Sequence, residues 1–133
     1  TLKSQADATA ALEWADQLEI SKELEPPARK RIEEQYQAVA AAEYLRVRNF
    51  FLGAIHTWFS QLYLLSSGVD QAHLPNPEFL AGLALPEQIS EDFTAAALRF
   101  SDDLIFNLRF NVNEELAMRT FCLNVAIQTE KAS

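Results

Sequence analysis

The longest regular pattern in the chain is an apolar row that begins after Ala28. Its members recur at three- and four-residue steps, which is the spacing of one face of an α-helix. They are Tyr36, Ala40, Tyr44, Val47, Phe51, Ile55, Trp58, Leu62 and Leu65, joined after residue 50 by Phe50, Ala54, Phe59 and Tyr63. The pattern predicts a helix from Ala28 to Leu65, more deeply buried in its second half, or two helices that meet near Asn49 or Gly53.

A shorter helix is predicted before this element and a stop after it. Residues 1–20 have Leu12, Trp14, Ala15 and Leu18 as their apolar members. Pro26 and Pro27 separate this helix from the long one, because the residue before a proline avoids the α region. Gly68 is a typical residue to end the long helix.

Three more helices are predicted in the second half of the chain. Asn76-Pro77-Glu78 is typical of a helix start, and this helix would run to about Ala84. Pro86 or Ser90 begins the next helix, and Asn113 caps the last. The apolar rows are Ile89, Phe93, Ala97, Phe100, Leu104 and Leu108 in the first of these two helices, and Leu116, Thr120, Leu123 and Ile127 in the second, with Phe121 at a neighbouring angle.

These elements add up to an all-α bundle of about five helices with a long second helix. No run of alternating polar and apolar residues indicates a strand. We expect residues 1–27 to form an N-terminal helix and linker, and residues 28–133 to form the helical bundle. The low content of glycine (3) and proline (5) in 133 residues agrees with a helical fold.

The charge balance and the cysteine content argue against duplex binding and against a disulfide-stabilised fold. The chain has 11 basic and 19 acidic residues, a net charge of −8, whereas a duplex-binding module needs basic residues to replace counterions on phosphates. A single cysteine excludes an internal disulfide and predicts a reducing, cytoplasmic compartment. No stretch is long and apolar enough to predict a membrane span. Because the first residue is Thr, we expect a piece of a longer or processed protein.

The sequence has no motif typical of nucleotide binding, metal binding or nucleophilic catalysis. Gly53, Gly68 and Gly82 stand alone and none precedes a lysine, as a phosphate-binding loop requires. His56 and His73 lack the glutamate three residues earlier that di-iron bundles use.

Three other sets of residues have ordinary structural interpretations. Cys122, in an apolar helix, is expected to be a buried small hydrophobe. The acidic pairs are adjacent in sequence and so do not converge on a helix; they are Glu33-Glu34, Glu91-Asp92, Asp102-Asp103 and Glu114-Glu115. Arg29, Lys30 and Arg31 are expected to be a solvated helix start, with an acidic-partner or nucleic-acid contact as the alternative. We therefore predict no catalytic, cofactor-binding or metal-binding residues.

The aromatic content of 11% is high for a small helical bundle. The chain has 14 aromatic residues, 9 of them Phe, and most fall on the apolar rows. We expect most of them in the core and some in a helix-mediated interface, where aromatic residues are enriched. The interface residues themselves stay unknown, since every candidate aromatic has an equally good place in the core.

The second half of the chain has an ordered series of helix and turn motifs. An aromatic-aliphatic helix (residues 49–59, NFFLGAIHTWF) ends at Ser66-Ser67-Gly68. A short helix follows, and then a longer one over Ile89–Arg109. Last comes an Asn-x-Asn turn that leads into an apolar helix (residues 110–119, FNVNEELAMR). In this order the motifs resemble the C-terminal helical (collar) domain of the clamp-loader family, of the bacterial DNA polymerase III delta-prime type. The resemblance covers residues 49–130.

This resemblance implies a non-catalytic domain that holds a clamp loader together during sliding-clamp loading in DNA replication. Its partners would be the other clamp-loader subunits in a hetero-oligomeric ring, with no direct nucleic-acid contact, no membrane and no small-molecule ligand or cofactor. Exposed apolar side chains and weak self-association are expected. The alternative is a ligand-binding or dimerisation domain of a helical transcription regulator, which predicts a homodimer and an enclosed apolar cavity.

Overall fold

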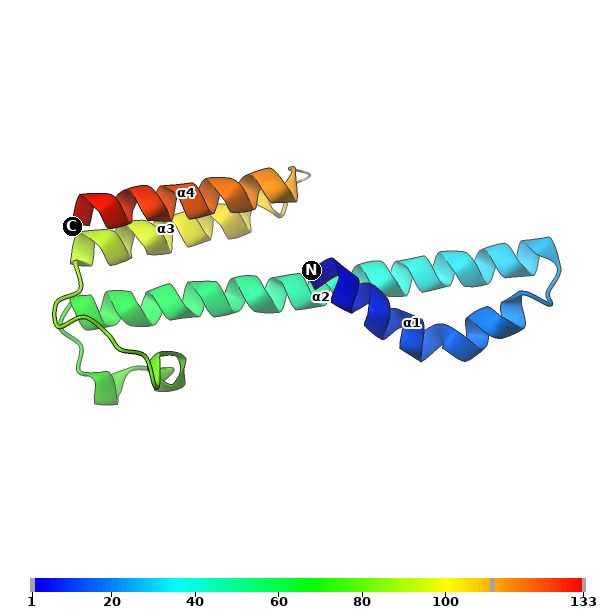
Figure 1. The fold of residues 1–133 in the computed structure, drawn as a ribbon, viewed down its shortest axis with the longest axis horizontal. Coiled ribbons are helices and arrows are strands. Elements are labelled where there is room, and N and C mark those ends of the chain that lie inside the picture. Colours follow the sequence, from blue (N-terminus) through cyan, green and yellow to red (C-terminus); the bar gives the residue numbers. More distant parts are fainter. Residues whose placement is uncertain (1, 111, 133) are drawn as a thin grey trace. The chain divides into compact units, whose positions relative to one another are not determined.

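The computed structural model describes residues 2–110 and 112–132, and within these residues it is all-helical (Figure 1). The predicted all-α class is confirmed. The helices are α1 (Leu2–Ser21), α2 (Pro26–Ser66), α3 (Glu91–Asn107) and α4 (Glu114–Ala132), with 3₁₀ turns η1 (Gln71–His73) and η2 (Pro77–Leu80) between α2 and α3. The predicted count of five helices is matched only roughly, because the third predicted helix is the short turn η2.

The chain divides into two compact units. The N-terminal unit is Thr1–Phe51 and the C-terminal unit is Leu52–Ser133, so the boundary falls inside α2. The sequence-based division into residues 1–27 and 28–133 falls at a different place, between α1 and α2. That division stays a prediction. The C-terminal unit covers nearly the same residues as the collar resemblance.

The N-terminal unit is a helical hairpin of α1 and the first turns of α2. Ala6 and Ala10 of α1 and Ala40 of α2 are buried. The Tyr36 hydroxyl donates a hydrogen bond to the carbonyl oxygen of Asp7 at 3.5 Å, which ties the two helices together. Because residues four apart share a helix face, the buried side of α1 continues from Ala6 and Ala10 through two predicted members, Trp14 and Leu18. The other two predicted members, Leu12 and Ala15, are exposed because they lie off this alanine-based face.

Helix α2 runs without a break past Asn49 and Gly53 and stops where glycine was predicted to stop it. Gly68 has φ +93°, a conformation that favours glycine. Its N–H bonds to the carbonyl of Leu65, and the N–H of Val69 bonds to that of Leu64, both at 3.0 Å. These are the two bonds of a Schellman motif, which satisfies the last carbonyls of the helix.

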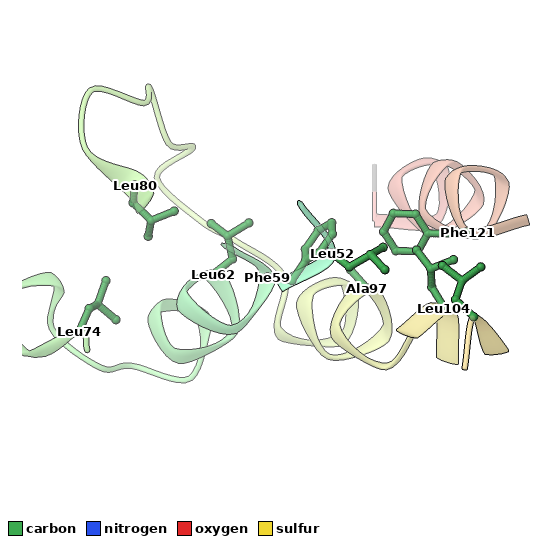
Figure 2. Packing of buried hydrophobic residues seen from close by; sticks show 9 residues of the cluster. Leu52, Phe59, Leu62, Leu74, Leu80, Ala97, Leu104 and Phe121 are labelled. Carbon is green, nitrogen blue, oxygen red and sulfur yellow. The ribbon is translucent and has the colours of Figure 1, made fainter. Parts of the chain in front are cut away.

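The core of the C-terminal unit forms where α3, α4 and the last turns of α2 pack together. In Figure 2, Leu52, Phe59 and Leu62 of α2 lie between two groups of side chains. One group is Leu74 and Leu80 from the turns, and the other is Ala97, Leu104 and Phe121 from α3 and α4. The prediction that Phe50 joins the buried row is wrong, as its side chain is 76% exposed.

The segment around Asn76 has a different role from the predicted helix start. The side chain of Asn76 makes no capping hydrogen bond. Its backbone N–H donates instead to Oε1 of the buried Gln61 at 3.1 Å, which fastens the connection to α2. The short turn η2 then places Leu80, which is 1% exposed, in the core. The helix predicted to run to about Ala84 is therefore only this short turn, which ends at the buried Leu80.

Capping side chains fix where α3 and α4 begin. Of the two predicted starts of α3, Ser90 is the observed one: its hydroxyl accepts a hydrogen bond from the N–H of Phe93 at 3.2 Å. The predicted cap of α4 is confirmed, since Asn113 Oδ1 accepts from the N–H of Leu116 at 2.9 Å. Asn111, the first asparagine of the Asn-x-Asn turn, lies outside the described residues.

Candidate docking surface

Helix α4 buries a different face from the one its apolar row predicts. Leu116 and Leu123 are 65% and 63% exposed, and Ile127 and Thr120 also face solvent. The buried residue is Phe121, whose ring packs against Phe59 of α2. With 100° per residue, α4 carries two apolar faces, and the core takes the one with the largest ring. The exposed set, Leu116, Thr120, Leu123 and Ile127, is called the α4 row below.

A groove of about 470 Å³ lies between the C-terminal half of α3 and the N-terminal half of α4, and it is open to solvent. Its lining residues are Phe100, Asp103, Leu104 and Asn107 of α3, Val112 and Asn113 of the connection, and Leu116, Ala117, Thr120, Phe121 and Asn124 of α4. Because Leu116 and Thr120 belong to both features, the α4 row and the groove form one continuous surface. We call it the α3–α4 surface.

Two exposed aromatic rings lie in the last turn of α3 and in the connection that follows it. Phe106 and Phe110 are 58% and 59% exposed and contact each other edge to face, with ring centroids 5.0 Å apart. Val112 in the connection is also exposed. Several exposed apolar side chains near one another in this way are typical of interaction sites rather than of an ordinary protein surface.

The C-terminal unit is acidic. It has ten acidic and four basic side chains, a net charge of −6 of the total −8. Asp103 is the one charged residue among those that line the groove. On the opposite flank of the α4 row, Arg119 pairs with Glu115 at 2.6 Å on the surface.

The two histidines lie on different elements. His56, half-buried on α2, bonds through Nε2 to Oδ1 of Asp102 on α3 at 2.8 Å, so it links two helices of the C-terminal unit. His73 is exposed in η1. Across residues 2–110 and 112–132, no group of three His, Cys, Asp or Glu side chains has the arrangement that would hold a metal ion.

Cys122 was predicted to be buried, and that prediction is wrong because the thiol is exposed. It follows Phe121 in sequence, and adjacent residues on a helix point about 100° apart. Burial of Phe121 therefore turns Cys122 outward.

The predicted acidic pairs and the basic cluster are surface features with separate partners. Asp102 bonds to His56 and Glu115 to Arg119, whereas Glu91 accepts a hydrogen bond from Ser67 at 3.4 Å. Arg29, Lys30 and Arg31 are exposed at the start of α2, and Lys30 lies 3.9 Å from Glu34. These contacts do not bring the acidic pairs together at one point.

The Glu43–Arg46 pair on α2 shifts the pKa values of both of its members. The Arg46 guanidinium donates from Nε and Nη2 to the two carboxylate oxygens of Glu43, at 2.8 and 2.7 Å. These hydrogen bonds, aided by the opposite charge, lower the pKa of Glu43 and raise that of Arg46. The pair stabilises one turn of α2 and lies outside the α3–α4 surface.

Sequence reasoning did not find the α3–α4 surface, although one signal for it was present. Apolar residues continue through the α3–α4 connection, from Phe106 and Phe110 to Val112 and Leu116. Connections are normally polar because they face water, so apolar residues there point to an interaction site.

Comparisons with known protein families, with curated proteins and with solved structures find no match for this chain. In the described part of the chain, no helix combines the length and the apolar content that crossing a membrane requires.

Proposed function

We propose that the C-terminal unit is a non-catalytic oligomerisation (collar) domain of the clamp-loader delta-prime type. It docks onto other clamp-loader subunits in a hetero-oligomeric ring and so supports sliding-clamp loading in DNA replication. The observation that carries the proposal is the exposed α4 row beside a filled core. Leu116, Leu123 and Ile127 stay in water while Phe121 occupies the core position that the row was expected to take.

Three further observations support a docking role. The boundary at Leu52 gives a unit, residues 52–133, that coincides with the resemblance over residues 49–130. The row occupies one side of α4 for three turns, which is the geometry that helix-to-helix docking uses. The net charge of −6 agrees with a domain that contacts protein rather than DNA.

The alternative is a ligand-binding or dimerisation domain of a helical transcription regulator. Such a domain needs an apolar cavity closed between helices, because a small ligand must be largely removed from water. The α3–α4 groove is instead open along one side. The open groove therefore favours docking over ligand enclosure.

The test combines the chain with the other clamp-loader subunits of the same organism and measures complex formation by light scattering after size exclusion. We expect the wild-type chain to join the complex and Leu123→Asp to lose at least about tenfold in affinity, since a charge would be desolvated at the interface. Leu12→Asp is the matched control, because Leu12 is also an exposed helical leucine but lies in the N-terminal unit.

Circular dichroism of each variant verifies that the helices are retained. Full binding by Leu123→Asp would contradict the assigned surface. A tight homodimer that ignores the other subunits would contradict the collar role and favour the regulator.

A further inference from the structure

The groove has an apolar floor able to hold a large side chain. Phe100 and Leu104 of α3 face Ala117 and Phe121 of α4 across it. Leu116 forms one wall, and its exposed side chain continues into the α4 row. A volume of about 470 Å³ is enough to take an aromatic or leucine side chain and remove most of it from water.

The rim of the groove has a defined polar chemistry. Asn107, Asn113 and Asn124 carry amides that donate and accept hydrogen bonds, and Thr120 adds a hydroxyl. Asp103 differs from these, because an ionised carboxylate only accepts. It is exposed, and within the part of the chain that the structure describes it forms no ion pair. Arg99, one turn earlier on α3, does not line the groove.

Charge and helical spacing together define what fits this surface. The C-terminal unit has a net charge of −6, so a second copy of the chain would be repelled and a basic partner attracted. Leu116 and Leu123 are seven residues apart, and Ile127 follows four residues later. This spacing matches the apolar face of a second helix laid along α4, as in helix-in-groove recognition.

We infer that the α3–α4 surface receives a basic amphipathic helix of a sister subunit, which inserts a large apolar side chain into the groove and places a lysine or arginine against Asp103. This inference rests on the proposed function and names the chemistry of its partner. Asp103 selects the partner by charge, and the α4 row supplies the apolar contact.

The test uses the full chain and two synthetic helical peptides of about 15 residues, long enough to hold helical structure. Both have leucines at heptad spacing, and the flanking positions are lysine in one and glutamate in the other. Fluorescence anisotropy measures binding at low and at high salt. We expect the lysine peptide to bind at least about tenfold more tightly at low salt, with the preference shrinking as salt screens the charges.

Substitutions of Asp103 test whether this residue causes the preference for the lysine peptide. Asp103→Asn should remove most of the preference, and Asp103→Lys should reverse it toward the glutamate peptide. Asp92→Asn changes the net charge equally on the same helix but outside the groove lining, so the preference should remain.

Three results would overturn the inference: equal binding of both peptides, equal effects of Asp103→Asn and Asp92→Asn, or no binding of either peptide at about 1 mM, a very weak limit. Failure here is distinguishable from failure of the proposed function. The assay with intact sister subunits depends on Leu123 and uses no peptide, so docking stands if only the charge preference fails.

Discussion

Phe59 of α2 and Phe121 of α4 meet edge to face in the C-terminal unit, with ring centroids 6.2 Å apart and ring planes inclined by 73°. Both rings are buried, at 5% and 9% exposure. Edge-to-face contact adds to the burial of two large apolar surfaces, because the positive edge of one ring meets the negative face of the other. This contact fixes which side of α4 faces the core and which side is left for a partner.

We expect Phe121→Ala to lower the free energy of unfolding of the C-terminal unit by about 3–5 kcal/mol, the usual cost of a cavity of this size. Trp58 lies in this unit, so its fluorescence in a Trp14→Phe background follows urea unfolding of that unit alone. Leu123→Ala is the matched control on the same helix and should change the stability by less than about 0.5 kcal/mol. Equal losses for the two variants would mean that α4 is rotated from the orientation described.

A second contact joins α2 to α3 through hydroxyl groups. Ser66 Oγ and Thr94 Oγ1 are 2.6 Å apart, and Thr94 is fully buried. Thr94→Val keeps the shape but removes the hydroxyl, and we expect a loss of roughly 1–2 kcal/mol in urea unfolding. Thr129→Val removes a hydroxyl that also bonds within its own helix but is exposed, so it should cost less than about 0.5 kcal/mol. The Thr94 hydroxyl also donates to the carbonyl oxygen of Glu91 at 3.0 Å, so a neutral Thr94→Val would show that these two contacts together contribute nothing net.

Helix ends were predictable because their chemistry is local. A serine, an asparagine or a glycine satisfies backbone groups within a few residues of itself, whatever the rest of the chain does. Ser90, Asn113 and Gly68 therefore appear where the sequence indicates them. Asn76 is the exception, since its backbone N–H is bound by Gln61, fifteen residues away, and only the short 3₁₀ turn η2 follows.

The orientation of α4 was not predictable from its own residues. The α4 row and Phe121 are two apolar faces of one helix, and spacing alone does not rank them. The choice depends on residues far away in sequence, such as Phe59 of α2, whose ring packs against Phe121. The groove could not be predicted for the same reason. It forms only when the packing of α3 against α4 brings Phe100 and Leu116 together.

The cap of α4 gives a third prediction. Asn113→Ala removes the hydrogen bond to the N–H of Leu116 and should cost about 1 kcal/mol, as N-cap losses commonly do. Asn76→Ala is the matched control, because that side chain makes no capping bond and alanine retains the backbone N–H that reaches Gln61. Thermal unfolding followed by circular dichroism compares them. A larger effect at Asn76 than at Asn113 would contradict the assignment of the caps.

The last prediction concerns the pH dependence of Glu43. The bidentate hydrogen bonds from Arg46 favour the carboxylate, so the pKa of Glu43 lies below its ordinary value. Folding then binds fewer protons at this site, and the stabilisation is present above the unfolded pKa and is lost as pH falls through the folded pKa. Carbon-13 NMR of the side-chain carboxyl measures the midpoint directly.

Arg46→Gln should move that midpoint upward, toward the ordinary glutamate range, since glutamine keeps the helix but not the charge. Arg31→Gln, which removes an exposed positive charge earlier on α2, is the control and should leave the midpoint of Glu43 unchanged because solvent screens distant charges. A midpoint that stays low in Arg46→Gln would show that something other than this guanidinium stabilises the carboxylate.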